Sequence, residues 1–152
     1  MPWRLLWLVL LVLGLAAPAQ AVSPVGILYS QNFDHQPLGS YSLGQLRQDW
    51  GIGYDQTGVR QGRVAVGGDG GSNHYLSVAY PAGKYGSQDS GAQWMYPLPG
   101  GLEAAFLSYQ VRFQEGFQFV KGGKLPGLAG GAANSGGHKP NGGDGWSARI
   151  MW

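Results

Sequence analysis

The clearest pattern in the chain is the strict alternation of apolar and polar residues over Leu107–Gln114. A period of two is typical of a β-strand with one buried face. The same period recurs in Trp146–Trp152, where Ser147 and Arg149 share one face and larger apolar residues share the other. Residues two apart on a strand lie roughly 7 Å from each other. We therefore expect Ser147 and Arg149 to contact one bound ligand together.

Shorter β-prone runs occur earlier in the chain. Val25–Phe33 has the composition of an entry strand, and Val64–Val66 and Tyr75–Tyr80 flank the sequence GGDGGSN, which predicts a hairpin connection. Leu43–Trp50 is the one short helical candidate. Short strands separated by Gly- and Pro-rich turns predict an all-β fold.

Glycine is the most unusual feature of the composition, with 28 glycines among 152 residues and only 12% charged residues. These values, together with the many aromatic residues, argue against a helical bundle and against ordinary disorder. Ten of the glycines fall between Gly122 and Gly145. We interpret that stretch as a long loop of the kind that often covers a binding site.

The first 21 residues have the form of a secretory signal peptide. They contain one basic residue, Arg4, then an apolar run over Leu5–Ala16 and a small-x-small ending at Ala19–Ala21. The run is shorter than the about 20 apolar residues of a membrane-spanning helix, which disfavours the alternative of an uncleaved anchor. We predict a secreted protein, extracellular or periplasmic, without membrane attachment after cleavage, whose residues 22–152 form one monomeric domain.

Charge and metal-binding residue types exclude several function classes. Without Arg4 the chain has nine Lys and Arg residues against eight Asp and Glu, so net charge gives no indication of a nucleic-acid partner. The chain has no cysteine, and its histidines, His35, His74 and His138, lack zinc-ligand spacing. We expect no cofactor; a structural calcium ion would suit the fold, but no acidic cluster indicates its ligands.

Two lysines, Lys121 and Lys124, flank a Gly-Gly pair, and Pro126 follows. Glycine permits a positive φ and a close backbone approach. The segment does not fit a P-loop, and no Gly-x-Ser-x-Gly nucleophile motif is present. Two interpretations stay open on this pattern: solvated loop charge, or a cationic groove for an anionic ligand.

Four segments together resemble the polysaccharide lyases of family 14, which cleave alginate and related polyuronates: FQFVKGGKLPGLAGG, LSYQVRFQEG, YPAGKYGSQDSGAQW and GWSARIMW. The glucuronan lyases of family 20 have a similar KLPG segment. The resemblance runs from about Phe33 to Trp152. It implies a β-jelly roll, a concanavalin-like sandwich of two antiparallel sheets, one of which binds an acidic polysaccharide on its concave face.

The resemblance also implies the reaction, which is β-elimination at a uronic acid, and its residues. The family's functional lysine falls in the KGGK segment, where we favour Lys124 over Lys121, and its functional serine and arginine fall on Ser147 and Arg149. An arginine suits the uronate carboxylate because its guanidinium stays charged and binds carboxylates through two hydrogen bonds.

Four further residues are candidates for substrate binding: Lys121, Gln93, Gln110 and Arg112. For each of them an ordinary strand or surface role is the alternative. The family's acid and base tyrosines lie on the strand after the Ser-x-Arg strand, and no residue here matches them. We therefore expect a C-terminally truncated family member that is inactive as this fragment. The alternative function is a non-catalytic carbohydrate-binding module on the same jelly roll, because a fold does not settle function.

Overall fold

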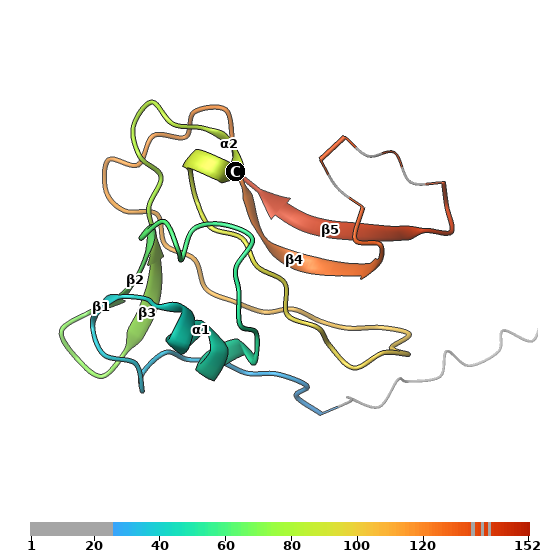
Figure 1. The fold of residues 1–152 in the computed structure, drawn as a ribbon, viewed down its shortest axis with the longest axis horizontal. Coiled ribbons are helices and arrows are strands. Elements are labelled where there is room, and N and C mark those ends of the chain that lie inside the picture. Colours follow the sequence, from blue (N-terminus) through green and yellow to red (C-terminus); the bar gives the residue numbers. More distant parts are fainter. Residues whose placement is uncertain (1–25, 135, 138, 140) are drawn as a thin grey trace, which may run out of the picture. The chain divides into compact units, whose positions relative to one another are not determined.

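The computed structural model describes residues 26–134, 136–137, 139 and 141–152. The predicted signal peptide, Val25 and His138 lie outside these residues. The chain divides into two compact units, Met1–Leu98 and Pro99–Trp152, whose elements are labelled in Figure 1. Each unit contains one antiparallel sheet.

The sheet of the first unit has three strands in the order β1 (Gly39–Ser40), β2 (Val64–Gly68) and β3 (His74–Val78). β2 and β3 pair residue by residue from one end to the other, so the predicted hairpin is confirmed, with slightly different strand ends. Alternate residues of β2 point into the core, because side chains of a strand alternate between its faces. The buried apolar core of this unit consists of Tyr41, Leu46, Val59, Val64 and Val66.

Helix α1 spans Leu43–Trp50, as the sequence predicted. Its first turn is closed by a capping box, in which the Ser42 hydroxyl accepts from the Gln45 N–H and the Gln45 side chain accepts from the Ser42 N–H. The helix ends at Gly51, which has φ 64° and donates its N–H to the Arg47 carbonyl. A left-handed residue at this position favours glycine.

A second, one-turn helix, α2 (Gly86–Asp89), is tied to the sheet region by Arg63. The Arg63 guanidinium donates to the Gly91 carbonyl at 2.8 Å, to the Thr57 hydroxyl at 2.6 Å and to the Ser87 carbonyl at 3.2 Å. One side chain therefore satisfies three acceptors from separate turns, which fixes the irregular backbone between β3 and the end of this unit.

The second unit contains the antiparallel pair β4 (Lys124–Gly131) and β5 (Gly145–Met151). β5 confirms the strand predicted at the end of the chain. β4 corrects the prediction of a loop over Gly122–Gly145, because Gly127 and Gly130 lie opposite Arg149 and Trp146 of β5 and leave room for these side chains. The loop proper connects Gly131 to Gly145.

Two predicted strands are wrong. In the described residues of Val25–Phe33 and in Leu107–Gln114 the backbone forms no strand. Only part of the face predicted to be buried is covered in Leu107–Gln114: Tyr109 and Phe113 are half-buried, whereas Leu107 and Val111 are exposed. A strand requires a partner for its backbone hydrogen bonds as well as an alternating pattern, and no described segment pairs with this one.

The described part of the chain is mostly β or irregular, with two antiparallel sheets and two short helices. The all-β prediction is confirmed at this level. The jelly roll, the concanavalin-like sandwich and the single domain over residues 22–152 stay predictions.

Candidate functional site

Ser147 and Arg149 lie on one face of β5, as the period of two predicted. Both are half-buried, whereas Trp146 and Ile150 on the other face are 53% and 61% exposed. The polar face of the strand is therefore the more enclosed one, which is unusual for residues of this type. This arrangement suits a face that binds a polar ligand.

A β-bulge in β4 determines where Lys124 points. The register pairs Lys124 with Met151 and Gly127 with Arg149, so β4 contains one residue more than β5 over this interval. Directly opposite residues of an antiparallel pair share a face. Lys124 thus shares the face of Met151, which by alternation is also the face of Arg149. Without the extra residue Lys124 would lie on the opposite face, so the bulge redirects this side chain.

Gly127 provides the space that Arg149 needs. A Cβ atom built on Gly127 would lie 2.5 Å from Cγ of Arg149 and would overlap the Ala148 carbonyl oxygen. The aliphatic part of Arg149 therefore passes directly over the Gly127 backbone. This contact restricts the side chain before any ligand binds, and restricted side chains lose less entropy on binding.

The Ser147 hydroxyl already has one partner in the structure. It donates to the Asn134 carbonyl at 2.6 Å, and the Asn134 side-chain amide donates to the Gly145 carbonyl at 3.3 Å. Ser147 therefore holds the start of the β4–β5 loop against β5. Its hydroxyl oxygen can still accept a hydrogen bond from a ligand hydroxyl, because its lone pairs are separate from its proton.

The two lysines of the KGGK segment occupy different backbone states. Lys121 has φ 61° and Gly122 has φ 69°, so two consecutive residues are left-handed. For a residue with a side chain this costs roughly 1–2 kcal/mol. Lys124, three residues later, begins β4 with an exposed side chain. The segment is thus a tight turn that leads into the strand with a strained lysine at its start.

An open pocket of about 380 Å³ lies beside Arg149. Its walls are largely apolar and include Phe106, Leu128 and Ile150. Tyr109 lines it as well and donates its hydroxyl to the Pro126 carbonyl at 3.2 Å. This hydrogen bond attaches the segment before β4 to the bulge that redirects Lys124.

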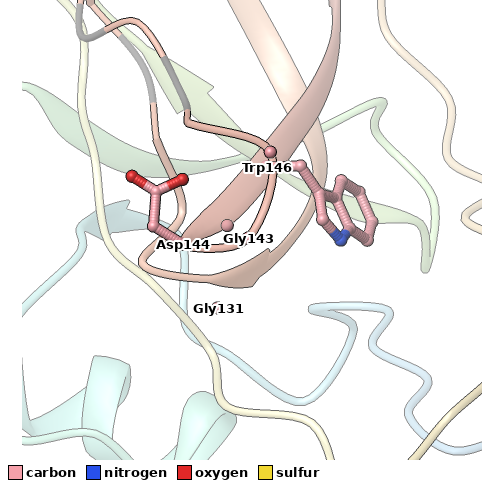
Figure 2. Close-up of a pocket in the computed structure, with 6 residues that line it drawn as sticks. Gly131, Gly143, Asp144 and Trp146 are labelled. Atoms are coloured by element: carbon pink, nitrogen blue, oxygen red, sulfur yellow. The ribbon is translucent and has the colours of Figure 1, made fainter.

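A second open pocket, of about 430 Å³, lies at the loop end of the β4–β5 hairpin. Figure 2 shows that the side chains of Asp144 and Trp146 point to opposite sides of the hairpin there. Oδ1 of Asp144 accepts from the Asn141 N–H at 3.2 Å, so this carboxylate stabilises the loop turn. The rest of the lining is glycine, and no predicted site residue contributes to it.

The β4–β5 hairpin lies in a region of the chain that matches a known protein family. The family model described as Polysaccharide lyase 14 matches residues 69–152, which is more than half of the chain. The chain belongs to polysaccharide lyase family 14. Family 14 membership supports lyase activity in general and a polysaccharide as the substrate. No curated protein and no solved structure matches the chain.

All seven predicted site residues of this family 14 chain lie inside the matched region. Lys124, Ser147 and Arg149 lie together on one hairpin, and Lys121 lies in the turn before it. The others are more dispersed, and their side chains are exposed: Gln110 and Arg112 in the irregular segment of the same unit, and Gln93 in the first unit, where its backbone pairs with Thr57. Their substrate-binding roles stay predictions.

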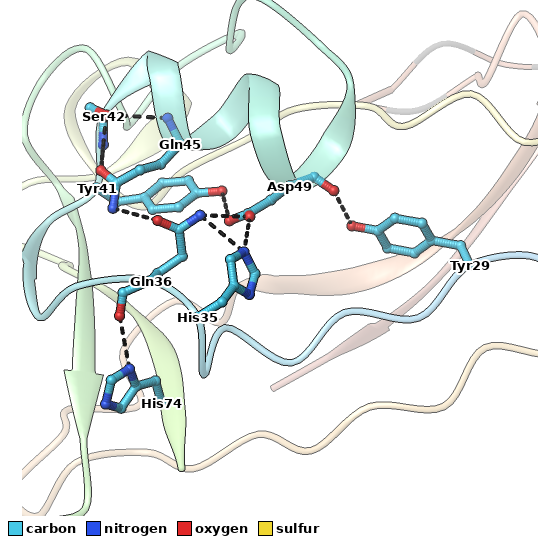
Figure 3. A network of polar contacts seen from close by, with 8 residues as sticks. All are labelled: Tyr29, His35, Gln36, Tyr41, Ser42, Gln45, Asp49 and His74. Atoms are coloured by element: carbon cyan, nitrogen blue, oxygen red, sulfur yellow. Dashed lines mark hydrogen bonds and ion pairs between the residues drawn. The ribbon is translucent and has the colours of Figure 1, made fainter. Parts of the chain in front are cut away.

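Outside the region matched to family 14, the first unit contains a buried polar network that the sequence did not reveal (Figure 3). The Asp49 side chain is fully buried. Its Oδ1 lies 2.7 Å from Nε2 of His35 and accepts from the Gln36 amide at 2.7 Å, while Oδ2 accepts from the Tyr41 hydroxyl at 2.7 Å. Figure 3 shows the three partners converging on the carboxylate from outside α1.

Two tyrosines near Asp49 are held in the protonated form. Burial, with the nearby Asp49 charge and Tyr96, raises the pKa of Tyr29 to about 12. Burial and the hydrogen bond to Asp49 raise the pKa of Tyr41 well above its usual range. Both hydroxyls are hydrogen-bond donors at neutral pH. Tyr29 donates to the Asp49 backbone carbonyl at 2.9 Å, and Tyr41 donates to the Asp49 carboxylate. The network therefore ties α1, through Asp49, to the segment that precedes it.

The described part of the chain has neither a cluster of metal-ligating side chains nor a membrane-spanning helix. It contains no group of three or more His, Cys, Asp or Glu residues that could hold a metal ion. It also contains no helix that is long and apolar enough to cross a membrane. The buried network could have been suspected from the polar Asp34–Gln36 run before a capped helix, but its partner Asp49 is too distant in sequence to be assigned.

Proposed function

We propose that this family 14 protein is a secreted lyase that cleaves uronic-acid polymers, such as alginate or glucuronan, by β-elimination. The observation that carries the proposal is the common face of Lys124, Ser147 and Arg149 on the β4–β5 hairpin, inside the matched region. Two cations beside a hydroxyl form a suitable site for a sugar that carries a carboxylate.

The reaction needs this charge because the C5 proton of a uronate is only weakly acidic. When a base removes that proton, its electron pair forms the C4–C5 double bond, and the C4–O4 bond breaks as O4 takes up a proton. Negative charge develops on the carboxylate during the first step. Donors and cations already aimed at that group stabilise it without reorganising. Arg149 and Lys124 supply this positive charge at the carboxylate. Groups other than these two remove the C5 proton and protonate O4.

The bulge favours Lys124 over Lys121 as the cation of the site. Lys124 shares a face with Arg149 because of the extra residue in β4. Arg149, restrained over Gly127, would bind the carboxylate through two hydrogen bonds. Lys124 would add a point charge to the same group, and the Ser147 oxygen would accept from a sugar hydroxyl.

The proposal also covers where the protein acts, its oligomeric state and its need for a cofactor. Residues 1–21 have the sequence of a secretory signal, which supports export to the periplasm or the outside medium. We propose a monomer that uses no cofactor, since arginine and lysine can provide the charge stabilisation that a metal ion provides in other enzymes.

The test combines binding and turnover on one panel of polymers: alginate, glucuronan and a neutral polysaccharide. We expect the protein to bind the two polyuronates in a salt-sensitive way and to ignore the neutral polymer. Arg149→Lys, which keeps the charge but loses the paired hydrogen bonds, should weaken binding by about tenfold or more. Lys84→Ala removes an exposed lysine of the first unit and is the matched control.

Turnover is followed in the same samples through the ultraviolet absorbance of the unsaturated uronate. Product from either polyuronate, lost in Lys124→Ala and Arg149→Lys, supports the lyase. Binding without product on every polymer fits both the inactivity expected of these 152 residues alone and the non-catalytic carbohydrate-binding module; product formed by a longer chain that supplies the family's acid and base tyrosines would then decide for the lyase. An equal response to charged and neutral polymers, or no binding at all, would refute the proposal.

A further inference from the structure

The Gly-Gly pair between the two lysines is covered by Trp152. A Cβ atom built on Gly123 would overlap the indole ring of Trp152, and one built on Gly122 would lie 2.6 Å from the Trp152 carbonyl oxygen. The Trp152 N–H also donates to the Gly123 carbonyl at 3.2 Å. The backbone between Lys121 and Lys124 is therefore in direct contact with one residue at the end of β5.

Trp152 is itself fixed by an aromatic cluster of the same unit. Its ring centroid lies 5.5 Å from that of Phe113 and 5.8 Å from that of Phe117, in edge-to-face geometry. Phe119 completes the cluster at 4.8 and 5.0 Å from the same two rings. Such edge-to-face pairs are favourable beyond the area they bury. The indole is thus held in place where it covers Gly123, and the Trp152 carbonyl lies against Gly122.

Both lysines depend on this contact for their backbone geometry. Lys121 precedes the covered pair and is left-handed at φ 61°, a state that persists only where neighbouring structure imposes it. Lys124 follows the pair and lies opposite Met151, the neighbour of Trp152. Gly123 has no positive φ, so an alanine there conflicts with the indole ring and with nothing in its own backbone conformation.

We propose that Trp152 is a positioning residue for the anion-binding lysines: by seating on Gly122 and Gly123 it fixes the turn that presents Lys121 and Lys124. The inference rests on the proposed function in that these lysines are taken to bind a uronate. It explains why the segment has two glycines between its lysines, since a side chain on Gly123 would displace the indole and one on Gly122 would meet the Trp152 carbonyl oxygen.

The experiment is a double-mutant cycle between Gly123→Ala and Trp152→Ala, with Trp152→Phe as the conservative variant and Gly100→Ala as the control. A Cβ atom on Gly100 meets nothing within 4 Å, and its φ is not positive. Affinity for a purified hexauronate is measured by calorimetry at two salt concentrations. Unfolding in urea, measured for every variant, separates loss of binding from loss of the fold.

We expect Gly123→Ala and Trp152→Ala each to weaken hexauronate binding by about tenfold, because two lysine side chains lose their preset geometry. The double variant should be no weaker than Trp152→Ala alone, since the alanine then has no ring to displace. Trp152→Phe should restore most of the affinity, and Gly100→Ala should match the wild type. Additive losses in the double variant, or no recovery with phenylalanine, would overturn the inference.

A second readout keeps the inference separate from the proposed function. Nuclear magnetic resonance of the wild type and of Trp152→Ala reports the backbone conformation of Lys121 without any ligand. We expect the left-handed state to be lost in the variant. If the wild type does not bind the hexauronate, the proposed function fails, whereas a Lys121 that stays left-handed in Trp152→Ala refutes the positioning role.

Discussion

Removing the Asp49 carboxylate should destabilise the first unit. The Asp49→Ala variant leaves three donors without their acceptor. Tyr41 and Gln36 are 2% and 3% exposed and cannot reach water, whereas the His35 side chain is 42% exposed and can. Each buried donor without a partner costs about 1–3 kcal/mol. The Gln36 amide keeps a second partner in Nε2 of His35 at 3.1 Å, so the buried Tyr41 hydroxyl alone predicts a loss of about 1–3 kcal/mol.

That loss is large against the about 5–15 kcal/mol that stabilises a typical domain. Urea unfolding is followed through tryptophan fluorescence, because Trp50 stacks at 5.2 Å on Tyr29, whose hydroxyl donates to the Asp49 carbonyl. Asp89→Ala removes an exposed carboxylate of α2 and is the control. A free energy of unfolding for Asp49→Ala within about 1 kcal/mol of the wild type would show that the network stabilises little and would refute this reasoning.

Three further predictions follow from single contacts. Gly127→Ala should displace the Arg149 side chain and also disturb the β4–β5 pairing, because its Cβ atom would overlap the Ala148 carbonyl oxygen, and uronate binding should weaken by about tenfold or more, measured by calorimetry, with circular dichroism following the strand pair; unchanged affinity would contradict it. Ser42→Ala should cost about 0.5–2 kcal/mol in urea unfolding, because it opens the capping box with Gln45. The raised pKa of Tyr29, about 12 against an ordinary 10.0, favours the folded state below pH 10 and ceases to do so as the pH rises towards 12; Tyr29→Phe should therefore lose less stability than the wild type over that interval.

Local signals in the sequence were sufficient for α1 and for the first hairpin. The Ser42-x-x-Gln45 box and Gly51 define both ends of α1 within the residues that form it. The turn-rich GGDGGSN sequence likewise lies between the two strands that it connects. These elements depend on hydrogen bonds between near neighbours, so a sequence pattern contains most of the information.

Elements that depend on distant partners were predicted less well. Leu107–Gln114 has the strongest alternation in the chain but does not pair with a strand among the described residues, whereas β4 looked like a loop because it is rich in glycine. In the candidate site, too, one feature follows from local sequence and another depends on a distant partner strand. The shared face of Ser147 and Arg149 follows from a period of two, but the bulge that brings Lys124 to it is visible only in the register with β5.

Two glycines that face large side chains across a strand pair affect how the strands align. Gly67 lies opposite Tyr75, and Gly130 lies opposite Trp146, with a Cβ atom on either glycine predicted to come within 2.6 Å of the ring. Glycine-rich strands are ordinarily prone to slide along their partners. A slip that brought Val66 opposite Tyr75, or Ala129 opposite Trp146, would put a side chain beneath the ring, whereas the opposite slip would bring Gly68 or Gly131 there. The ring that faces Gly67 or Gly130 therefore opposes sliding of the strand pair in one direction, so these glycines contribute to the alignment through the size of the side chains opposite them.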